Sequence, residues 1–146
     1  MSDKALIAAS VYLKGDLLKP DVVTATLGFE PDRSRTKGEK RGGERSRTKT
    51  YVAKTGLWVT KIKKYPIAGR DVFYEVPVVV DELLQRFKGR QDPLDQITSV
   101  EEAFLDILIL GNAKDTADFM LSKAQIARAG QLGLAISVTT SMTDDE

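Results

Sequence analysis

Residues 104–110 read FLDILIL, a run that is apolar at every position except Asp106. A run of this length suits a central β-strand covered on at least one face, and it is far shorter than the roughly 18–20 apolar residues of a membrane helix. Alternation or β-prone composition marks three further strands. They are expected at Ala5–Leu13, Gly56–Lys64 and Leu134–Met142. These four segments predict the sheet around which the chain folds.

Three helices are expected between these strands, each with a start signal and a glycine at its end. Proline suits a first helical position, because its missing N–H would have no partner there. In the second helix, apolar side chains recur at the i, i+3, i+4 and i+7 spacing of one helical face. The third opens with a capping box formed by Ser122 and Gln125. The expected starts are Pro20, Pro77 and Ser122, and the expected ends are Gly28, Gly89 and Gly133.

The order of these segments defines the fold class. It runs strand–helix–loop–strand–helix–strand–helix–strand, which predicts an α+β domain with one mixed sheet of about four strands and helices packed on it. A more regular parallel α/β sheet is the alternative. A chain of 146 residues is long enough for one core, so we expect a single domain over residues 1–141. Residues 142–146 end in three acids and are expected to form a frayed tail.

A basic segment at residues 31–54 follows the first helix. The pentapeptide RSRTK occurs in it twice, at Arg33–Lys37 and at Arg45–Lys49, and almost nothing is apolar before Tyr51. Such a segment cannot build a core, so we expect a long exposed loop. Three roles stay open for it: a solvated loop, a docking site for an acidic protein surface, or a site for nucleic-acid phosphates. The candidate residues are Arg33, Arg35, Lys37, Lys40, Arg41, Arg45, Arg47 and Lys49.

Two observations limit the phosphate-binding roles of this segment. No aromatic residue lies between Phe29 and Tyr51, so the segment has no stacking platform for single strands. Its glycines also lack phosphate-loop spacing, because Glu44 and Arg45 stand where that motif requires Lys and Ser or Thr.

Charge is distributed unevenly along the chain. Residues 1–70 carry sixteen Lys or Arg and seven Asp or Glu, whereas residues 71–146 carry six and fourteen. A bipolar protein can steer a charged partner, unless the two halves interleave in the fold and their fields cancel. An acidic surface could mimic phosphates and dock a basic partner, with an ordinary solvated face as the alternative. Its candidate residues are Asp81, Glu82, Asp92, Asp95, Glu101 and Glu102.

The composition restricts the catalytic chemistry. The chain has no Cys and no His, which excludes thiolate chemistry, disulfides and the commonest general base. We therefore expect no enzyme activity, no catalytic residue, no metal site and no cofactor. The alternative is an enzyme that relies on carboxylates, lysines, a hydroxyl group or a hard metal ion. Asp106 is expected on a solvated face or edge of the sheet, because a buried carboxylate would need a partner. Trp58 is expected to anchor the core under the middle helix, and Leu108 and Ile109 are also expected to be core residues.

Neither a membrane span nor a secretion signal is expected. The N-terminal stretch MSDKALIAAS has an acid beside its lysine and only a short, broken apolar patch. We therefore expect a cytoplasmic protein.

Several of these features together resemble a bacterial family known only as a domain of unknown function, DUF4279. Its members have a first strand ending in glycine, a short helix ending in Leu-Gly-x-x-Pro, a Lys-Gly loop and a Gly-x-Trp strand. The matching residues are Leu27, Gly28, Pro31, Lys37, Gly38, Gly56 and Trp58. The C-terminal LSKAQIARAGQLGLAISV is similar to the family's last helix and strand. The basic loop is larger than the family pattern, and Pro77 with the valines after it departs from that pattern.

The resemblance implies a small bacterial protein without established catalytic residues, in a family where some members act as immunity proteins against toxins. Combined with the composition, it predicts a non-enzymatic protein-binding role, most specifically a toxin-neutralising immunity protein whose partner is a cognate toxin. The alternative is a nucleic-acid-associated protein that binds phosphates through residues 33–49.

Overall fold

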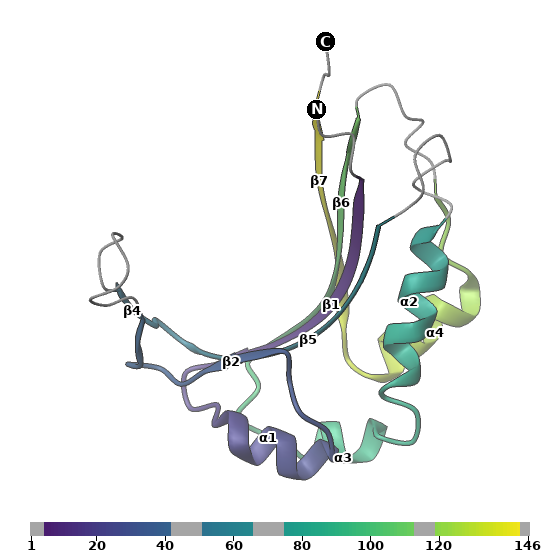
Figure 1. The fold of residues 1–146 in the computed structure, drawn as a ribbon. Helices are drawn as coiled ribbons and strands as arrows, with labels where there is room; N and C mark the ends of the chain where they lie inside the picture. Colours follow the sequence, from purple (N-terminus) through teal and green to yellow (C-terminus); the bar gives the residue numbers. More distant parts are fainter. Residues whose placement is uncertain (1–4, 42–50, 66–74, 113–118, 144–146) are drawn as a thin grey trace.

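The computed structural model describes residues 5–41, 51–65, 75–112 and 119–143. These residues form one mixed five-stranded sheet, a two-stranded ribbon and four helices (Figure 1). The strands are β1 (Leu6–Gly15), β2 (Arg33–Arg35), β3 (Lys40–Arg41), β4 (Tyr51–Val52), β5 (Gly56–Lys64), β6 (Glu102–Asn112) and β7 (Ala135–Thr143). The helices are α1 (Pro20–Leu27), α2 (Val76–Gln85), α3 (Gln91–Asp95) and α4 (Lys123–Gln131).

The large sheet has the strand order β2-β5-β1-β6-β7. All neighbours are antiparallel except β6 and β7, which are parallel and joined through α4. A parallel pair needs such a crossover, whereas antiparallel strands can be joined by shorter turns. The prediction of a single mixed α+β sheet is confirmed, but the number of strands is five rather than about four.

The extra strand comes from the segment that was expected to be a loop. Arg33–Arg35 pairs with β5, and Lys40–Arg41 pairs with Tyr51–Val52 in the small ribbon. Backbone groups make these ladders, so short polar strands can form without the apolar pattern that strand prediction relies on. The loop prediction is therefore wrong for this part of the segment. The second RSRTK, at Arg45–Lys49, lies outside the described residues.

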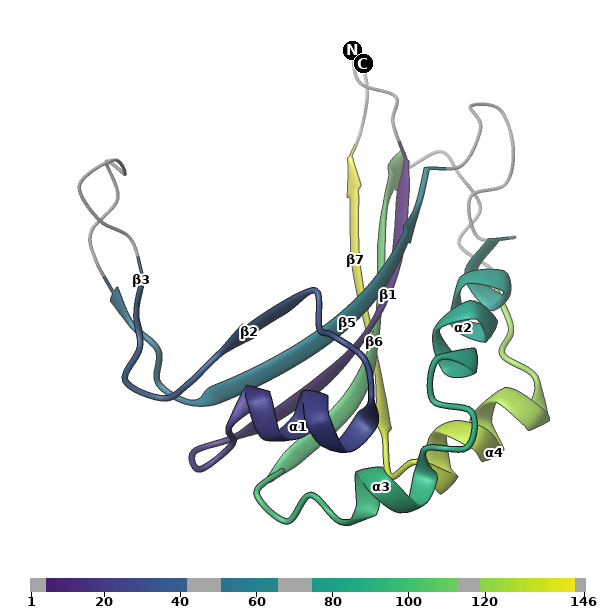
Figure 2. The same ribbon diagram turned by 60° about the horizontal axis from the view of Figure 1, so that its bottom comes forward.

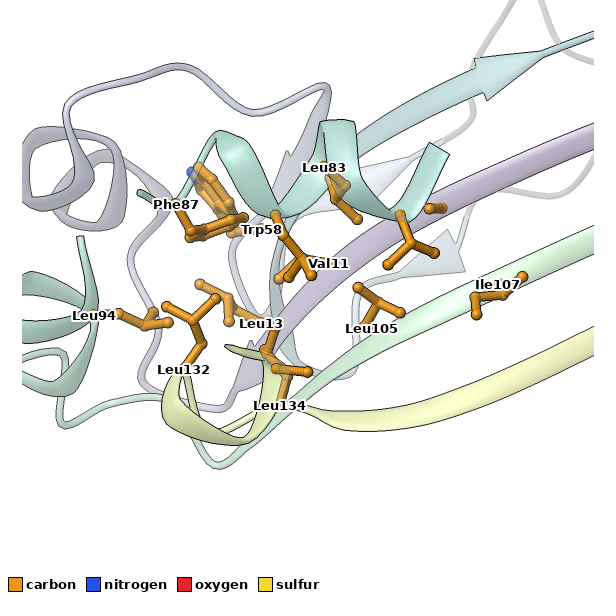
Figure 3. Packing of buried hydrophobic residues seen from close by; sticks show 14 of the residues in the cluster. Val11, Leu13, Trp58, Leu83, Phe87, Leu94, Leu105, Ile107, Leu132 and Leu134 are labelled. Carbon is orange, nitrogen blue, oxygen red and sulfur yellow. The ribbon is translucent and has the colours of Figure 1, made fainter. Parts of the chain in front are cut away.

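The sheet is strongly curved, and the helices lie on its outer, convex side (Figures 1 and 2). Side chains of β1 that point to this side are buried, and so are the β6 side chains that lie opposite Ile7, Ala9 and Val11. They pack against α2 and the residues around α4 and α1 (Figure 3). The convex-side core residues of the two strands are Ile7, Ala9, Val11, Leu13, Leu105, Ile107 and Ile109.

Trp58 is the largest fully buried side chain, which confirms the predicted core anchor. Its indole Nε1–H donates a hydrogen bond to Thr24 Oγ1 at 3.1 Å, and its ring meets Phe29 edge-on at 5.4 Å. Phe29 in turn meets Phe87 edge-on at 5.5 Å. Trp58 therefore contacts α1 and the residues after it, in addition to sharing the core with the middle helix.

Two glycines lie opposite each other where β1 ends and β5 begins. Gly15 and Gly56 are direct register partners, and both are buried. A Cβ on Gly15 would collide with the carbonyl oxygen of Ser99, and one on Gly56 would lie 2.7 Å from the carbonyl oxygen of Leu18. Close backbone approach thus explains the glycine at these two strand ends.

The predicted start and end signals are confirmed for α1 and α4. α1 runs from Pro20 and is closed by Gly28 in the left-handed conformation, with φ of 88°. At α4, Ser122 Oγ accepts from the Gln125 N–H at 3.1 Å and Gln125 Oε1 accepts from the Ser122 N–H at 2.9 Å, which confirms the capping box.

Several element boundaries differ from the prediction. α2 begins one residue before Pro77 and ends at Gln85, with a turn leading to Gly89. The segment between α2 and β6 contains the short helix α3, which has too few residues for a periodic signal in the sequence. β7 continues to Thr143 because it pairs with β6 as far as Asn112, so residues 142–143 belong to the domain rather than to a tail.

Candidate functional site

None of the described helices lies on the concave side of the sheet, and this side is the candidate site (Figure 1). Successive side chains of a strand point to opposite faces, so the residues between the core positions lie here. The register aligns them in rows across the sheet. One row contains Arg33, Val59, Tyr12 and Phe104, and the next contains Arg35, Leu57, Lys14 and Glu102.

Basic residues dominate one side of this surface. We call it the concave basic face and define it by Lys14, Arg33, Arg35, Lys54, Lys61 and Lys63. Arg33 and Arg35 come from β2, whereas Lys61 and Lys63 come from β5 two residues apart. Because these side chains converge from separate strands, the surface presents a positive potential that can attract an anionic group.

Two acids of the described concave surface, Glu102 and Asp106, lie on the β6 side, and a third, Asp32, lies beside β2. Asp106 Oδ1 accepts hydrogen bonds from Ser137 Oγ at 2.7 Å and from Thr139 Oγ1 at 3.1 Å. Its side chain is half-buried on the concave side, which confirms the predicted solvated face. The two hydroxyl groups are the hydrogen-bond partners that a partly buried carboxylate needs. Leu108 also lies on this face and is half-buried, so its assignment to the core is wrong, whereas Ile109 is fully buried.

A pocket of about 400 Å³ opens in the concave basic face. It lies between β1, β2, β5 and the chain that leads from β4 into β5. Four of its lining residues are cationic, and none of the described lining residues is acidic. The lining residues are Tyr12, Lys14, Arg33, Arg35, Val52, Ala53, Lys54, Thr55 and Leu57.

An aromatic pair lies beside this pocket. The rings of Tyr12 and Phe104 stack in parallel with centroids 4.9 Å apart, and the Lys14 ammonium lies 5.4 Å from the centroid of Phe104. Such contacts stabilise the pair and hold Lys14 at the mouth of the pocket.

A second hollow, lined by Asp32, Arg33, Val59, Lys61 and Lys63, continues the basic surface along β2 and β5. The Asp32 carboxylate accepts the Lys61 backbone N–H at 2.7 Å and lies 3.5 Å from Arg86 Nη1. Arg86 offsets part of its negative charge, and the three cations of the hollow, Arg33, Lys61 and Lys63, outnumber this one carboxylate.

The predicted basic residues separate into three groups. Arg33 and Arg35 lie on the concave basic face. Lys37 forms an ion pair with Asp16 at 3.3 Å, and Lys40 is exposed in β3. The side chain of Arg41 and the whole of Arg45, Arg47 and Lys49 lie outside the described residues.

The predicted acidic residues are spread over α2, α3 and the start of β6. Glu82 pairs with Lys64 at 2.9 Å, and this hydrogen bond is the main reason that the pKa of Lys64 is raised above its usual value. Asp81 Oδ1 accepts from Gln125 Nε2 at 2.7 Å, and Glu101 Oε2 accepts from the Asp16 N–H at 2.7 Å. Three of the six therefore serve contacts within the chain. The other three, Asp92, Asp95 and Glu102, are exposed.

Sequence reasoning missed four of the cations and both stacked aromatics. Lys61 and Lys63 had a signal, because strand alternation places them on the same face as Leu57 and Val59. Lys14, Lys54, Tyr12 and Phe104 gave none, since only the cross-strand register brings them beside Arg33 and Arg35.

The described ranges contain no group of three or more acidic residues placed to hold a metal ion. Among the same residues, no helix combines the length and apolar character needed to cross a membrane. The described residues form a concave cationic surface with an apolar floor, which can bind an anionic group.

The fold and this surface define the chain as an α+β protein whose curved sheet is covered by helices on one side in the described part. It belongs to the DUF4279 family, a domain of unknown function, whose family model matches residues 5–143. The resemblance seen in the sequence is therefore confirmed over nearly the whole chain. No curated protein and no solved structure showed significant similarity to it.

Proposed function

We propose that this protein is a non-enzymatic binding protein whose concave basic face docks an acidic segment of a protein partner. The observation that carries the proposal is the pocket in which Lys14, Arg33, Arg35 and Lys54 converge without an acidic lining residue among those described. Arginine forks and lysines bind carboxylates through charge-assisted hydrogen bonds, and the concave shape increases their combined field.

The floor of the pocket favours a protein segment over a simple ion. Leu57 and Ala53 are buried there, and Val52 is exposed at its rim. Apolar contacts of this kind would bury an aliphatic or aromatic side chain that neighbours the acid. An acidic segment that also carries an apolar residue therefore matches both the charge and the shape of the pocket.

The particular form that we propose is a toxin-neutralising immunity protein, with the acidic segment belonging to the cognate toxin. Co-expression with the product of the adjacent gene tests this form. The adjacent gene product should be toxic alone and harmless beside the wild-type protein, and the charge-reversed variant Arg33→Glu with Lys54→Glu should fail to protect. A product that is harmless alone, or toxic in the presence of the wild type, overturns the immunity role.

The binding surface can be tested without the partner. The probe is a fluorescent Glu-rich peptide that contains one Leu, and its anisotropy is measured with the wild type and with Arg33→Glu plus Lys54→Glu. We expect the dissociation constant to rise at least about tenfold, because two attractive contacts become repulsive. The matched control is the double variant Lys88→Glu plus Lys123→Glu, two exposed lysines of the helical side. Equal loss in both double variants, or no binding by the wild type, contradicts the proposal.

A second candidate is nucleic-acid binding, which the aromatic rings beside the cations favour. Single strands stack on aromatic faces that lie open between basic residues. Here the rings of Tyr12 and Phe104 stack on each other, so each ring has only one face left on which a base could stack. An oligonucleotide of the same charge as the peptide should therefore bind less tightly. Tighter binding that falls steeply with salt would favour this candidate instead.

A further inference from the structure

The two edges of the large sheet differ in length and in charge. β2, at one edge, has three residues, of which two are arginines. β7, at the other edge, has nine residues, AISVTTSMT, and no charge or proline among them. Sheet edges are usually protected against pairing by charges, prolines, bulges or short length. β2 has two of these protections, whereas β7 has none of them.

The outer side of β7 is open in the described part of the chain. The strand pairs with β6 on its inner side, and no described strand pairs with its outer side. Ile136 is 39% exposed and Val138 is 47% exposed, although their register partners Leu105 and Ile107 are buried. The helices that cover the convex side of β6 therefore leave the apolar side chains of β7 exposed, next to a row of outward N–H and C=O groups.

We propose that β7 pairs antiparallel with β7 of a second copy of this chain, so that the two sheets join across a twofold axis. Such an isologous contact needs a strand that is complementary to itself. β7 meets this requirement because it has no charged side chain, so no like charges meet when it lies against its own copy. The same lack of charge gives a strand from a different protein no electrostatic basis for selection.

The side chains fit an axis near Ser137 or Val138. With Ser137 opposite its own copy, Ile136 lies opposite Val138 of the partner, and the reverse pair forms on the other side of the axis. Cross-strand pairs of β-branched residues stabilise an antiparallel ladder, and the pairing would cover the exposed surface of both residues. This proposal concerns the edge strand and is independent of ligand binding on the concave basic face.

The mass of the wild type in solution, measured by sedimentation over a wide concentration range, is the first test. We expect a dimer that dissociates on dilution, and a monomer at all concentrations overturns the proposal. Val138→Lys should raise the dimer dissociation constant at least about tenfold. With the axis at Val138 the two lysines lie opposite each other, and with the axis at Ser137 each lysine replaces the apolar partner of Ile136. Val22→Lys is the matched control, since Val22 is 53% exposed on α1 and away from this edge. Equal dimerisation of both variants also overturns the proposal.

Cross-linking keeps the test decisive if the lysine variant misfolds. The chain has no cysteine, so single substitutions give unambiguous disulfides. Ser137→Cys or Val138→Cys should form a reducible dimer on mild oxidation, and Ala25→Cys on the exposed side of α1 should not. Cross-linking at Ala25 equal to that at both strand positions would show random collision and would contradict the paired edge. A stable complex with an unrelated cellular strand, in place of the dimer, would also contradict it.

Discussion

The two faces of the sheet use the same strands for different purposes. In β1, Val11 and Leu13 point to the helices and are fully buried, whereas the alternate residues Tyr12 and Lys14 point to the concave side. The convex face therefore holds most of the folding free energy, and the concave face presents charge to solvent. This difference teaches that folding and partner binding should be separable by substitution, since neighbouring residues of one strand belong to different faces.

The largest expected effect comes from the convex face. Trp58→Ala removes a fully buried ring and its hydrogen bond to Thr24, so we expect a loss of about 3–5 kcal/mol in the free energy of unfolding. Urea denaturation followed by circular dichroism measures it. A loss below about 1 kcal/mol would contradict the central place of Trp58 in the core.

A smaller loss of stability is expected from a substitution at Gly15, the last residue of β1. Gly15→Ala introduces a methyl group against the Ser99 carbonyl, which should cost roughly 1–3 kcal/mol because backbone must move. Gly130→Ala is the matched control: its Cβ meets nothing within 4 Å, and alanine favours the helix, so stability should rise by about 0.5–1 kcal/mol. Thermal unfolding of both variants makes the comparison. Equal changes would show that close approach does not explain Gly15.

On the concave face, Arg33→Glu should leave the free energy of unfolding within about 0.5 kcal/mol, because the Arg33 side chain is exposed. The same substitution should weaken binding of the acidic peptide severalfold. Urea denaturation and fluorescence anisotropy are measured on one preparation. If stability and binding fall together, the two faces are not separable as described.

The smallest effect is expected at the rim of the convex face, where Lys64 pairs with Glu82. The hydrogen bond from Lys64 to Glu82 raises the pKa of Lys64 above 10.5, so Glu82→Gln should lower that pKa toward its usual value. Because the folded-state pKa is raised, the pair stabilises the fold fully below pH 10.5 and loses this contribution as the pH rises through the raised value. An NMR titration of the Lys64 side chain measures the shift, and an unchanged pKa in the variant would contradict the assigned cause.

Local signals predicted the long elements well. The period-two pattern of residues 56–64 and the proline and glycine around α1 depend on neighbours a few residues away, so the sequence displays them directly. β2, β3, β4 and α3 are too short for such patterns, and their stability comes from pairing or packing with distant residues. The same reason explains why the basic segment was expected to be a loop although Arg33–Arg35 forms an edge strand.

The residues of the candidate site could likewise be predicted only in part from the sequence. The sequence indicated that Arg33 and Arg35 are exposed cations, but it could not indicate that Lys14 and Lys54 converge with them on one pocket. It also placed six acids in one candidate surface, whereas the fold engages Asp81, Glu82 and Glu101 in contacts within the chain.

The sequence by itself determined the class of the fold, the family, the positions of the long strands and helices, and the absence of thiol and imidazole chemistry. These depend on composition and on periodicity over a few residues. Only the tertiary structure decided which face of the described sheet the helices cover, which cations share a pocket and which strands lie at the edges of the described sheet. Each of these depends on the register between strands that are far apart in the chain, and on which side of the sheet the helices pack.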